Sequence, residues 1–266
     1  MIDIHHHLLP ALDDGSVSLE TSVLMVEAAV ADGISRIVCT PHASHHWRFD
    51  PAVNAAKLAE LKAVLPPGIE DRIQFGLGCD FHLSHENIED ALAHSTKYTI
   101  NGGQYLLVEL PDFGFSANMR DVFYNLRMAG MIPILTHPER NPTLIEKPDR
   151  MIDWLRDGLL VQITANSLTG RFGKICERMA HQLLSDQWVH FIATDAHNTQ
   201  SRPPLMRQAC EIVAKKYGDE AAQRLCVANP LAVFEDRQFP EQPEPKRVFD
   251  EEEGRAASWW RRLFRS

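Results

Sequence analysis

Short runs of apolar and β-branched residues recur along the chain, and most are followed by a longer stretch with helical periodicity. A run of about four to eight such residues between turn residues is typical of a buried strand, and apolar positions three and four residues apart are typical of an amphipathic helix. We therefore expect seven strands. They are Ile2–Leu8, Arg36–Thr40, Ile73–Cys79, Tyr105–Glu109, Ile132–Thr136, Leu159–Thr164 and Val189–Thr194.

The helical stretches between these runs have recognisable ends. Ser18 can cap the first helix, and Gly33, Gly130 and Gly158 stand where a helix must stop before a strand begins. Alternation of strands and helices is typical of a parallel α/β fold, and a distorted (β/α)7 barrel explains it. An open doubly wound sheet remains an alternative, because the strand count does not decide closure. The expected helices are Leu19–Asp32, Pro51–Val64, Glu86–Ala93, Ala117–Ala129, Pro148–Arg156, Phe172–Asp186, Pro204–Lys216 and Asp219–Val227.

The pattern fades near residue 235, so we expect residues 1–235 to form the folded domain. Residues 236–249 hold Pro240, Pro243 and Pro245 among charged and amide side chains. This composition is typical of an extended, unpacked linker.

The last segment, residues 250–266, has the pattern of an amphipathic basic helix. At about 100° per residue, its aromatic and aliphatic side chains fall on one side of a helical wheel and its arginines on the other. So short a helix is marginal in water, and we expect it to fold on an anionic membrane surface. A disordered tail, or one docked on the domain, is the alternative. The two sets are Trp259, Trp260, Leu263 and Phe264, and Arg255, Arg261, Arg262 and Arg265.

Composition and charge narrow the class of protein. The chain has 266 residues, 44% of them hydrophobic, which suits one large α/β domain. Its formal net charge of -9 argues against a nucleic-acid partner and against a nuclease. It shows neither a secretory signal nor an apolar run long enough to span a bilayer, so we expect a cytoplasmic protein. The five cysteines are scattered and are expected to be reduced thiols, and none has the arginine six positions later that a cysteine phosphatase needs.

Histidines and carboxylates gather at the ends of the expected strands. His5 and His7 alternate along the first strand and so point to one face, and Asp195 and His197 repeat that spacing after the last strand. In a parallel barrel these strand ends face one rim, where such barrels build their active sites. We therefore expect a metal site there. The other strand-end candidates are His42, Asp80, Glu109 and His137, with His82 as a competitor of Asp80.

The same residues stand in a series of motifs. The chain resembles the PHP-type (polymerase and histidinol phosphatase) protein-tyrosine phosphatases of bacterial capsule and exopolysaccharide systems, from residue 2 to about Asn229-Pro230. The motifs that carry the resemblance are Ile2–His7, Asp13-Asp14-Gly15, Thr40-Pro41-His42, Thr136–Arg140, Thr194–His197 and Arg202–Met206.

The resemblance implies a distorted barrel that carries three divalent metal ions. The family typically has glutamate at the position of Asp80, so the shorter side chain here must either draw in or lose a metal contact. Imidazole and carboxylate ligands without thiolate suit transition metals, with manganese as the first expectation and iron or zinc as alternatives. The implied ligands are His5, His7, Asp14, His42, Asp80, Glu109, His137, Asp195 and His197.

The implied reaction is hydrolysis of phosphotyrosine by metal-activated hydroxide, as a regulator of exopolysaccharide and capsule synthesis. Arg140 and Arg202 are expected to clamp phosphate oxygens, and His42 or His197 to donate a proton to the leaving group. The expected partner is a tyrosine-phosphorylated protein such as a bacterial tyrosine kinase. The alternative is a PHP phosphatase for a small metabolite such as histidinol phosphate, which would use the same metals.

Overall fold

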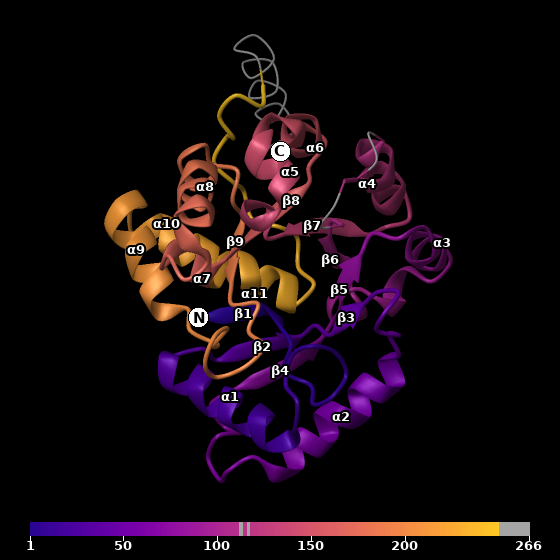
Figure 1. Cartoon of the computed structure of the whole chain (residues 1–266), viewed down its shortest axis with the longest axis vertical. Coiled ribbons are helices and arrows are strands. Elements are labelled where there is room, and N and C mark those ends of the chain that lie inside the picture. The colour runs from indigo at the N-terminus through magenta and orange to yellow at the C-terminus, as the bar shows by residue number, and fades with distance from the viewer. Residues whose placement is uncertain (112–113, 116–117, 250–266) are drawn as a thin grey trace, which may run out of the picture.

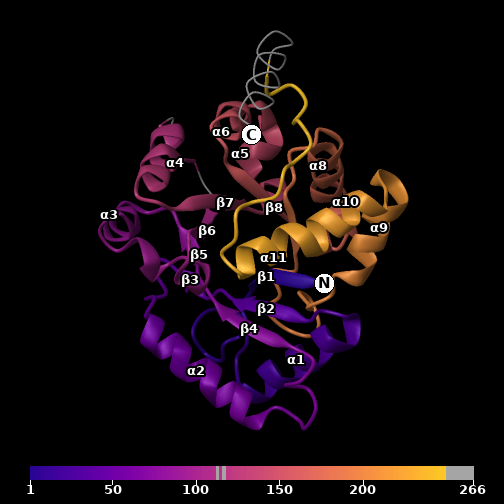
Figure 2. The same ribbon diagram turned by 180° about the vertical axis from the view of Figure 1, so that it is seen from behind.

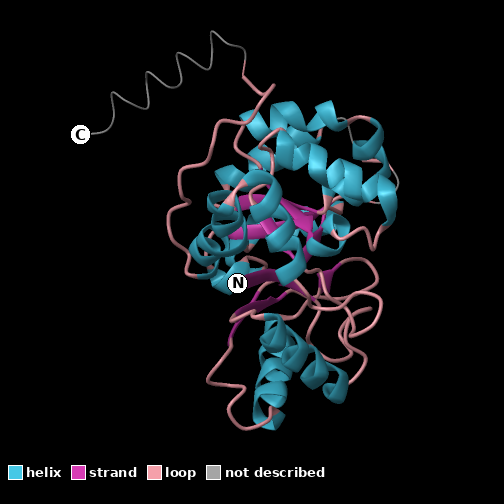
Figure 3. Ribbon diagram, turned by 90° about the vertical axis from the view of Figure 1, so that its left-hand side faces the viewer, coloured by secondary structure: helices cyan, strands magenta, loops and turns pink. Residues whose placement is uncertain are grey.

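The strands form two parallel sheets in the computed structural model, which describes residues 1–111, 114–115 and 118–249 (Figure 1). One sheet has the strand order β1-β2-β4 and the other β3-β5-β6-β7-β8-β9. Figure 3 shows the strands in the middle of the molecule, with helices on both sides. The strands are β1 (Ile2–His6), β2 (Arg36–Cys39), β3 (His42–Ala43), β4 (Gln74–Leu77), β5 (Asp80–His82), β6 (Tyr105–Glu109), β7 (Ile132–Thr136), β8 (Leu160–Thr164) and β9 (Phe191–Ala193).

All seven expected strands are present, and two short strands, β3 and β5, lie beyond the expected ends of the second and third. The second continues from β2 into β3, and the third from β4 into β5. The two sheets meet where β1 lies beside β9, through an isolated bridge between His6 and Ala196 and a hydrogen bond of 2.8 Å from the Asp195 amide to the His5 carbonyl. The strands thus follow one another around a ring in chain order. An open doubly wound sheet would instead reverse that order, so the strand order agrees with the predicted distorted barrel and not with the alternative.

The helices cover the outside of this ring. Helices α1 and α2 lie against the β1-β2-β4 sheet at the bottom of Figure 1. Ser18 caps α1 as expected, its hydroxyl accepting from the Thr21 amide at 3.2 Å. The helices are α1 (Leu19–Asp32), α2 (Pro51–Val64), α3 (His85–Ala93), α4 (Met119–Met128), α5 (Pro142–Glu146), α6 (Ile152–Arg156), α7 (Ala165–Leu168), α8 (Gly173–Ser185), α9 (Arg207–Tyr217), α10 (Asp219–Gln223) and α11 (Asn229–Phe234).

Two expected helices differ in detail from the structure. The stretch expected as Pro148–Arg156 begins with a 3-10 helix, Pro148–Met151, and becomes α-helical only in α6. The stretch expected as Asp219–Val227 is α10 followed by a π-helix, η5 (Arg224–Ala228), which runs on into α11. Among the described residues, no helix combines the length and the apolar character that crossing a membrane requires.

The core has an inner and an outer part, and the period of two along the strands separates them. In β6, Tyr105 and Leu107 belong to the cluster inside the barrel, and Leu106 and Val108 to the larger cluster under the helices. All four side chains are fully buried. The strands therefore read as continuous apolar runs, as is typical of sheets covered on both faces. Apolar side chains fill the interior of the barrel up to the rim, where the polar side chains begin.

The proline-rich stretch is extended but is not unpacked, contrary to the expectation of a free linker. We call residues 237–249 the C-terminal strap; Figure 2 shows it running from α11 toward the C-terminal end. Trp188 Nε1 donates to the Lys246 carbonyl at 2.8 Å, and Arg156 Nη2 donates to the Val248 carbonyl at 2.9 Å. The Val248 side chain is fully buried in the outer core. The amphipathic tail expected at residues 250–266 lies outside the described residues.

Two of the five cysteines are paired, so the expectation that all are reduced thiols is wrong for them. Cys210 in α9 and Cys226 in η5 form a disulfide across a Cα separation of 6.6 Å. Helix α10 packs against both elements and brings them together. Cys39 and Cys79 are buried free thiols, and Cys176 is partly exposed.

Candidate metal centre

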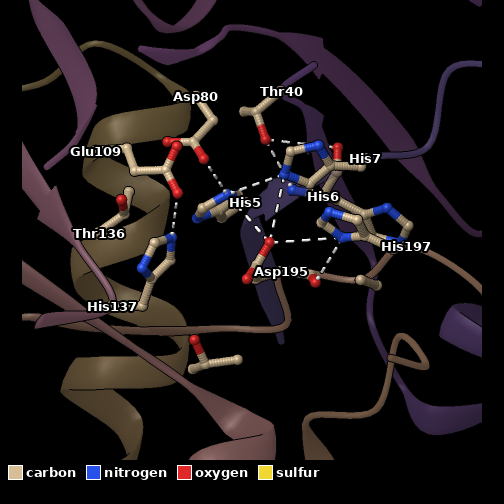
Figure 4. A network of polar contacts seen from close by, with 12 residues as sticks. His5, His6, His7, Thr40, Asp80, Glu109, Thr136, His137, Asp195 and His197 are labelled. Atoms are coloured by element: carbon tan, nitrogen blue, oxygen red, sulfur yellow. Dashed lines mark hydrogen bonds and ion pairs between the residues drawn. The ribbon is translucent and has the colours of Figure 1, made fainter. Parts of the chain in front are cut away.

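The nine expected ligands lie together at the carboxyl ends of the strands, where Figure 4 shows several of them converging. They come from β1, β3, β5 and β6 and from the segments that follow β1, β7 and β9. Among the described residues, they make four overlapping groups whose donor atoms lie within 4.8 Å of one another. The groups are His7, Asp14, His42 and His197; His5, His7 and Asp80; His5, His137 and Asp195; and His42, Asp80 and Glu109.

Distances at the centre of the cluster suit ligands that share an ion. His5 Nε2 lies 3.2 Å from His7 Nε2, 3.3 Å from Asp80 Oδ2 and 3.4 Å from Asp195 Oδ1. Two ligands about 2.1 Å from one ion at a tetrahedral angle stand about 3.4 Å apart. These contacts are long for hydrogen bonds but are the spacing that a shared cation requires.

Two further groups flank this centre. On one side, Asp14 Oδ1 lies 3.3 Å from His42 Nε2 and 3.4 Å from His197 Nε2. On the other, Glu109 Oε1 lies 3.5 Å from His137 Nε2, and Glu109 Oε2 lies 3.7 Å from His42 Nδ1. The imidazole and carboxylate donors are therefore spread over several adjoining groups.

Several ligand atoms are buried without a hydrogen-bond partner among the described residues. They are both carboxylate oxygens of Asp80 and Nε2 of His197. Burying such atoms unpaired costs free energy, so native proteins normally provide a partner. A divalent cation supplies that partner, and the donor set therefore fits a metal.

Asp80 reaches the cluster in spite of its short side chain. It belongs to the group with His5 and His7 and also to the group with His42 and Glu109. Its competitor His82 belongs to none of these groups, and its Nδ1 lies 3.8 Å from Glu109 Oε2. The geometry thus favours Asp80 over His82 as the ligand.

Several carboxylates lie close together at the site, and their negative charge favours positive charge beside them. Burial raises the pKa of Glu109, and the neighbouring Asp80 charge raises it further. Burial would also raise the pKa of Asp195, but His5 and Arg202 hold it well below its usual range. Burial lowers the pKa of His5, yet the Asp80 and Asp195 carboxylates outweigh this effect and raise it to about 9. Carboxylates crowded in this way are stabilised by added positive charge, which divalent ions would supply.

Asp13 and Gln162, neither of them predicted as part of the site, orient His7 and His5 at the end of the first strand. His7 Nδ1 donates to Asp13 Oδ2 at 2.7 Å, and His5 Nδ1 lies 2.9 Å from Gln162 Oε1. The pKa of Asp13 is lowered to about 2, because His7 and the Gly15 amide outweigh the effect of burial. Asp13 is therefore an ionised acceptor, and Nε2 of His7 is left free for an ion.

The Asp13-Asp14-Gly15 turn is packed directly against His7. Asp13 Oδ1 accepts from the Gly15 amide at 2.9 Å, and Asp13 Oδ2 accepts from the His42 amide at 3.0 Å. A Cβ on Gly15 would lie 2.4 Å from both Cβ and the carbonyl oxygen of His7. Only glycine fits there, and this close approach places Asp14 beside His42.

Two candidate ligands lie in strained backbone. His137 has φ of 33° and Asp195 has φ of 51°, in the left-handed region that residues other than glycine rarely adopt. Such outliers gather at functional sites, where the surrounding structure holds them in place. The strain points both side chains into the cluster.

The two arginines expected to clamp phosphate lie at the same cavity, but both bind a ligand carboxylate. Arg140 Nη1 and Arg202 Nη2 donate to Oδ2 of Asp195, whose Oδ1 faces His5 and His7. The Arg140 guanidinium also lies over the Phe172 ring, 4.6 Å from its centroid. The arginines thus bring positive charge to the edge of the cluster.

A cavity of about 520 Å³ opens over the cluster. Its floor holds Asp80, Glu109 and Asp195, with the two arginines at the same opening. Trp47, Leu110 and Pro111 also line it, among several histidines.

Comparison with known proteins gives one consistent family. The family model for capsular polysaccharide synthesis, CpsB/CapC, matches residues 1–235. The chain is 32% identical over 255 residues to the tyrosine-protein phosphatase YwqE of Bacillus subtilis (strain 168), covering 92% of this chain and 96% of that protein. It is 29% identical over 245 residues to the tyrosine-protein phosphatase CpsB of Streptococcus pneumoniae, covering 89% of this chain and 99% of that protein.

Solved structures agree with this result. A structure from the work on YwqE and CpsB, described as unique metal-dependent tyrosine phosphatases, matches with a TM-score of 0.84 and 31% identity, covering 94% of this chain and 100% of that one. The lactonase Lmo2620 of Listeria monocytogenes matches with a TM-score of 0.58 and 12% identity, which shows a shared fold alone.

Proposed function

The chain belongs to the CpsB/CapC family of capsular polysaccharide synthesis, and from that membership we propose that it is a metal-dependent protein-tyrosine phosphatase. The observation that carries the proposal is the convergence of histidine and carboxylate donors from successive strands on one cavity that two arginines also line. The relatives named tyrosine-protein phosphatases match over nearly their whole length, which supports the transfer of that activity.

The proposed cofactor is a set of three divalent ions, manganese first and iron or zinc as alternatives. Mixed imidazole and carboxylate donors without a thiolate suit these ions. The four overlapping groups of candidate ligands would hold them. When bound, such ions activate water as the nucleophile and neutralise the charge of the phosphoryl group.

The proposed role of Arg140 and Arg202 is to orient the phosphate. Each guanidinium carries five N–H donors, and only one from each is bound to Asp195. The remaining donors are available for phosphate oxygens, because both residues line the cavity. They therefore link the substrate to the carboxylate that contacts His5 and His7.

His42 is the better placed of the two proposed proton donors. Both rings face carboxylates of the cluster, so the difference between them is access: His197 is not among the described residues that line the cavity. His42 lines the cavity itself. A phenol leaving group, with a pKa near about 10, needs such help less than an aliphatic alcohol does.

The proposed substrate is a tyrosine-phosphorylated protein such as a bacterial tyrosine kinase, and the proposed setting is the cytoplasm. The capsule-synthesis family and the tyrosine phosphatase relatives support this assignment. The acidic balance of the chain, with a net charge of -9, disfavours a nucleic-acid substrate.

Removing and restoring the metal tests the function. Chelation should abolish hydrolysis of a phosphotyrosine peptide, and adding back single metals to the stripped protein should restore it. The same protein should hydrolyse histidinol phosphate far more slowly. Full activity in metal-free protein contradicts the proposal, and preferred hydrolysis of histidinol phosphate replaces it with the metabolite phosphatase.

A further inference from the structure

Trp47 is an aromatic side chain at the cavity that takes no part in the metal cluster. The loop that carries it is closed on itself by Ser44. The Ser44 hydroxyl accepts from the His46 amide at 3.2 Å and from the Trp47 amide at 3.3 Å, and the Ser44 amide donates to the Trp47 carbonyl at 3.0 Å. These bonds fix the backbone from which the indole ring projects.

The indole ring is aligned with a ring of the metal cluster. It stacks on His42, with the ring centroids 5.1 Å apart and the planes at 17°. His42 in turn faces Asp14, Asp80 and Glu109. The indole therefore lies against a candidate ligand of the cluster and lines the same cavity.

The cavity offers few other surfaces for an aromatic ring. Among the described residues that line it, Trp47 is the only phenylalanine, tyrosine or tryptophan. Leu110 and Pro111 also line the cavity and complete an apolar wall. Most of the remaining lining side chains are histidines, carboxylates and arginines.

We propose that Trp47 determines specificity by binding the phenyl ring of phosphotyrosine and so favours aryl over alkyl phosphates. With the phosphate held at the arginines, the ring of an aryl ester extends beside the indole and pairs with it in an offset stack. A phosphoserine side chain has no ring and is too short to cover the same wall. This inference rests on the proposed phosphatase function and adds the residue that selects the leaving group.

The test measures binding, so that it does not depend on turnover. Phenylphosphonate and methylphosphonate share the phosphonate group and differ in the ring. Each is titrated calorimetrically into the metal-loaded full chain. The wild type should bind phenylphosphonate more tightly than methylphosphonate. Trp47→Leu should lower the affinity for phenylphosphonate by about threefold to tenfold and leave the affinity for methylphosphonate unchanged. Trp47→Phe should retain most of the difference in affinity between the two phosphonates.

Controls separate ring binding from support of His42. Tyr124→Leu removes an aromatic side chain of α4 that is 58% exposed and is not among the cavity-lining residues, and it should change neither affinity. An equal loss for both phosphonates in Trp47→Leu, or no loss for either, overturns the inference. A wild type that prefers phenylphosphonate but fails to hydrolyse a phosphotyrosine peptide contradicts the proposed function alone.

Discussion

Asp13 contacts three parts of the metal centre through its two carboxylate oxygens. One oxygen accepts from His7 Nδ1 and from the His42 amide, and the other accepts from the Gly15 amide. The side chain thus connects the first strand, the segment after the second strand and the turn that carries Asp14. A carboxylate behind a metal-binding histidine fixes the ring and makes it a better ligand.

We predict that Asp13→Ala lowers the affinity for manganese by about 10- to 100-fold, because His7 loses its orientation and the turn loses its support. Competition with a metal chelator measures the affinity. Asp13→Asn keeps an oxygen acceptor without the charge, so it should lose less manganese affinity than Asp13→Ala. Asp71→Ala removes an exposed carboxylate and serves as the matched control. Unchanged affinity in Asp13→Ala would show that His7 needs no partner.

Among the elements, the C-terminal strap is the one whose role differs most from the expectation. A proline-rich, charged segment was expected to lie free, but Val248 is fully buried and its carbonyl accepts from Arg156. Trp188, also fully buried, uses its only side-chain donor on the strap. Prolines keep the segment extended. The buried Val248, the packed Phe239 ring, the hydrogen bonds to Trp188 and Arg156 and the ion pairs of Arg247 hold it on the domain.

Val248→Ala should reduce the free energy of unfolding by about 1–3 kcal/mol, since it leaves a cavity in the outer core. Urea unfolding followed by circular dichroism measures this change. Glu244→Ala changes an exposed residue of the same strap and should alter stability by no more than about 0.5 kcal/mol. Equal stability of both variants with the wild type would mean that the strap does not contribute to the folded domain.

For the whole molecule, charge separates the tail from the rest of the chain. Residues 250–266 contain four acidic residues and four arginines, so the net charge of -9 belongs to residues 1–249. An anionic membrane therefore repels the domain, and binding would depend on the apolar and basic half of the tail. The strap defines where a truncation must end, because removing Val248 would also damage the core.

We predict that the full chain sediments with anionic liposomes more than a version ending at Phe249, and that added salt weakens this binding. Both forms should hydrolyse a soluble phosphotyrosine peptide equally. Liposomes of zwitterionic lipid are the control for charge. If the two forms sediment equally, the tail has no membrane role, whereas loss of peptide hydrolysis in the shorter form would assign the tail to the catalytic domain.

The sequence by itself determined the elements and the chemistry of the site, because the signals for both are local. Apolar runs and helix ends placed α1, α2, β6 and β7 at the bounds that the structure shows. A period of two put His5 and His7 on one face, and the barrel rule put the other strand-end candidates at the same rim. Asp14 was implied by the family resemblance alone. All nine candidate ligands accordingly fall in the groups that the structure brings together.

Only the tertiary structure decided which distant residues support the site and the core. Gln162 supports His5 from 157 positions away, and Cys210 pairs with Cys226 through the packing of α10 between their helices. The burial of Val248 likewise depends on a surface formed by distant segments. Contacts of this kind arise from how elements pack, which no local period or composition encodes.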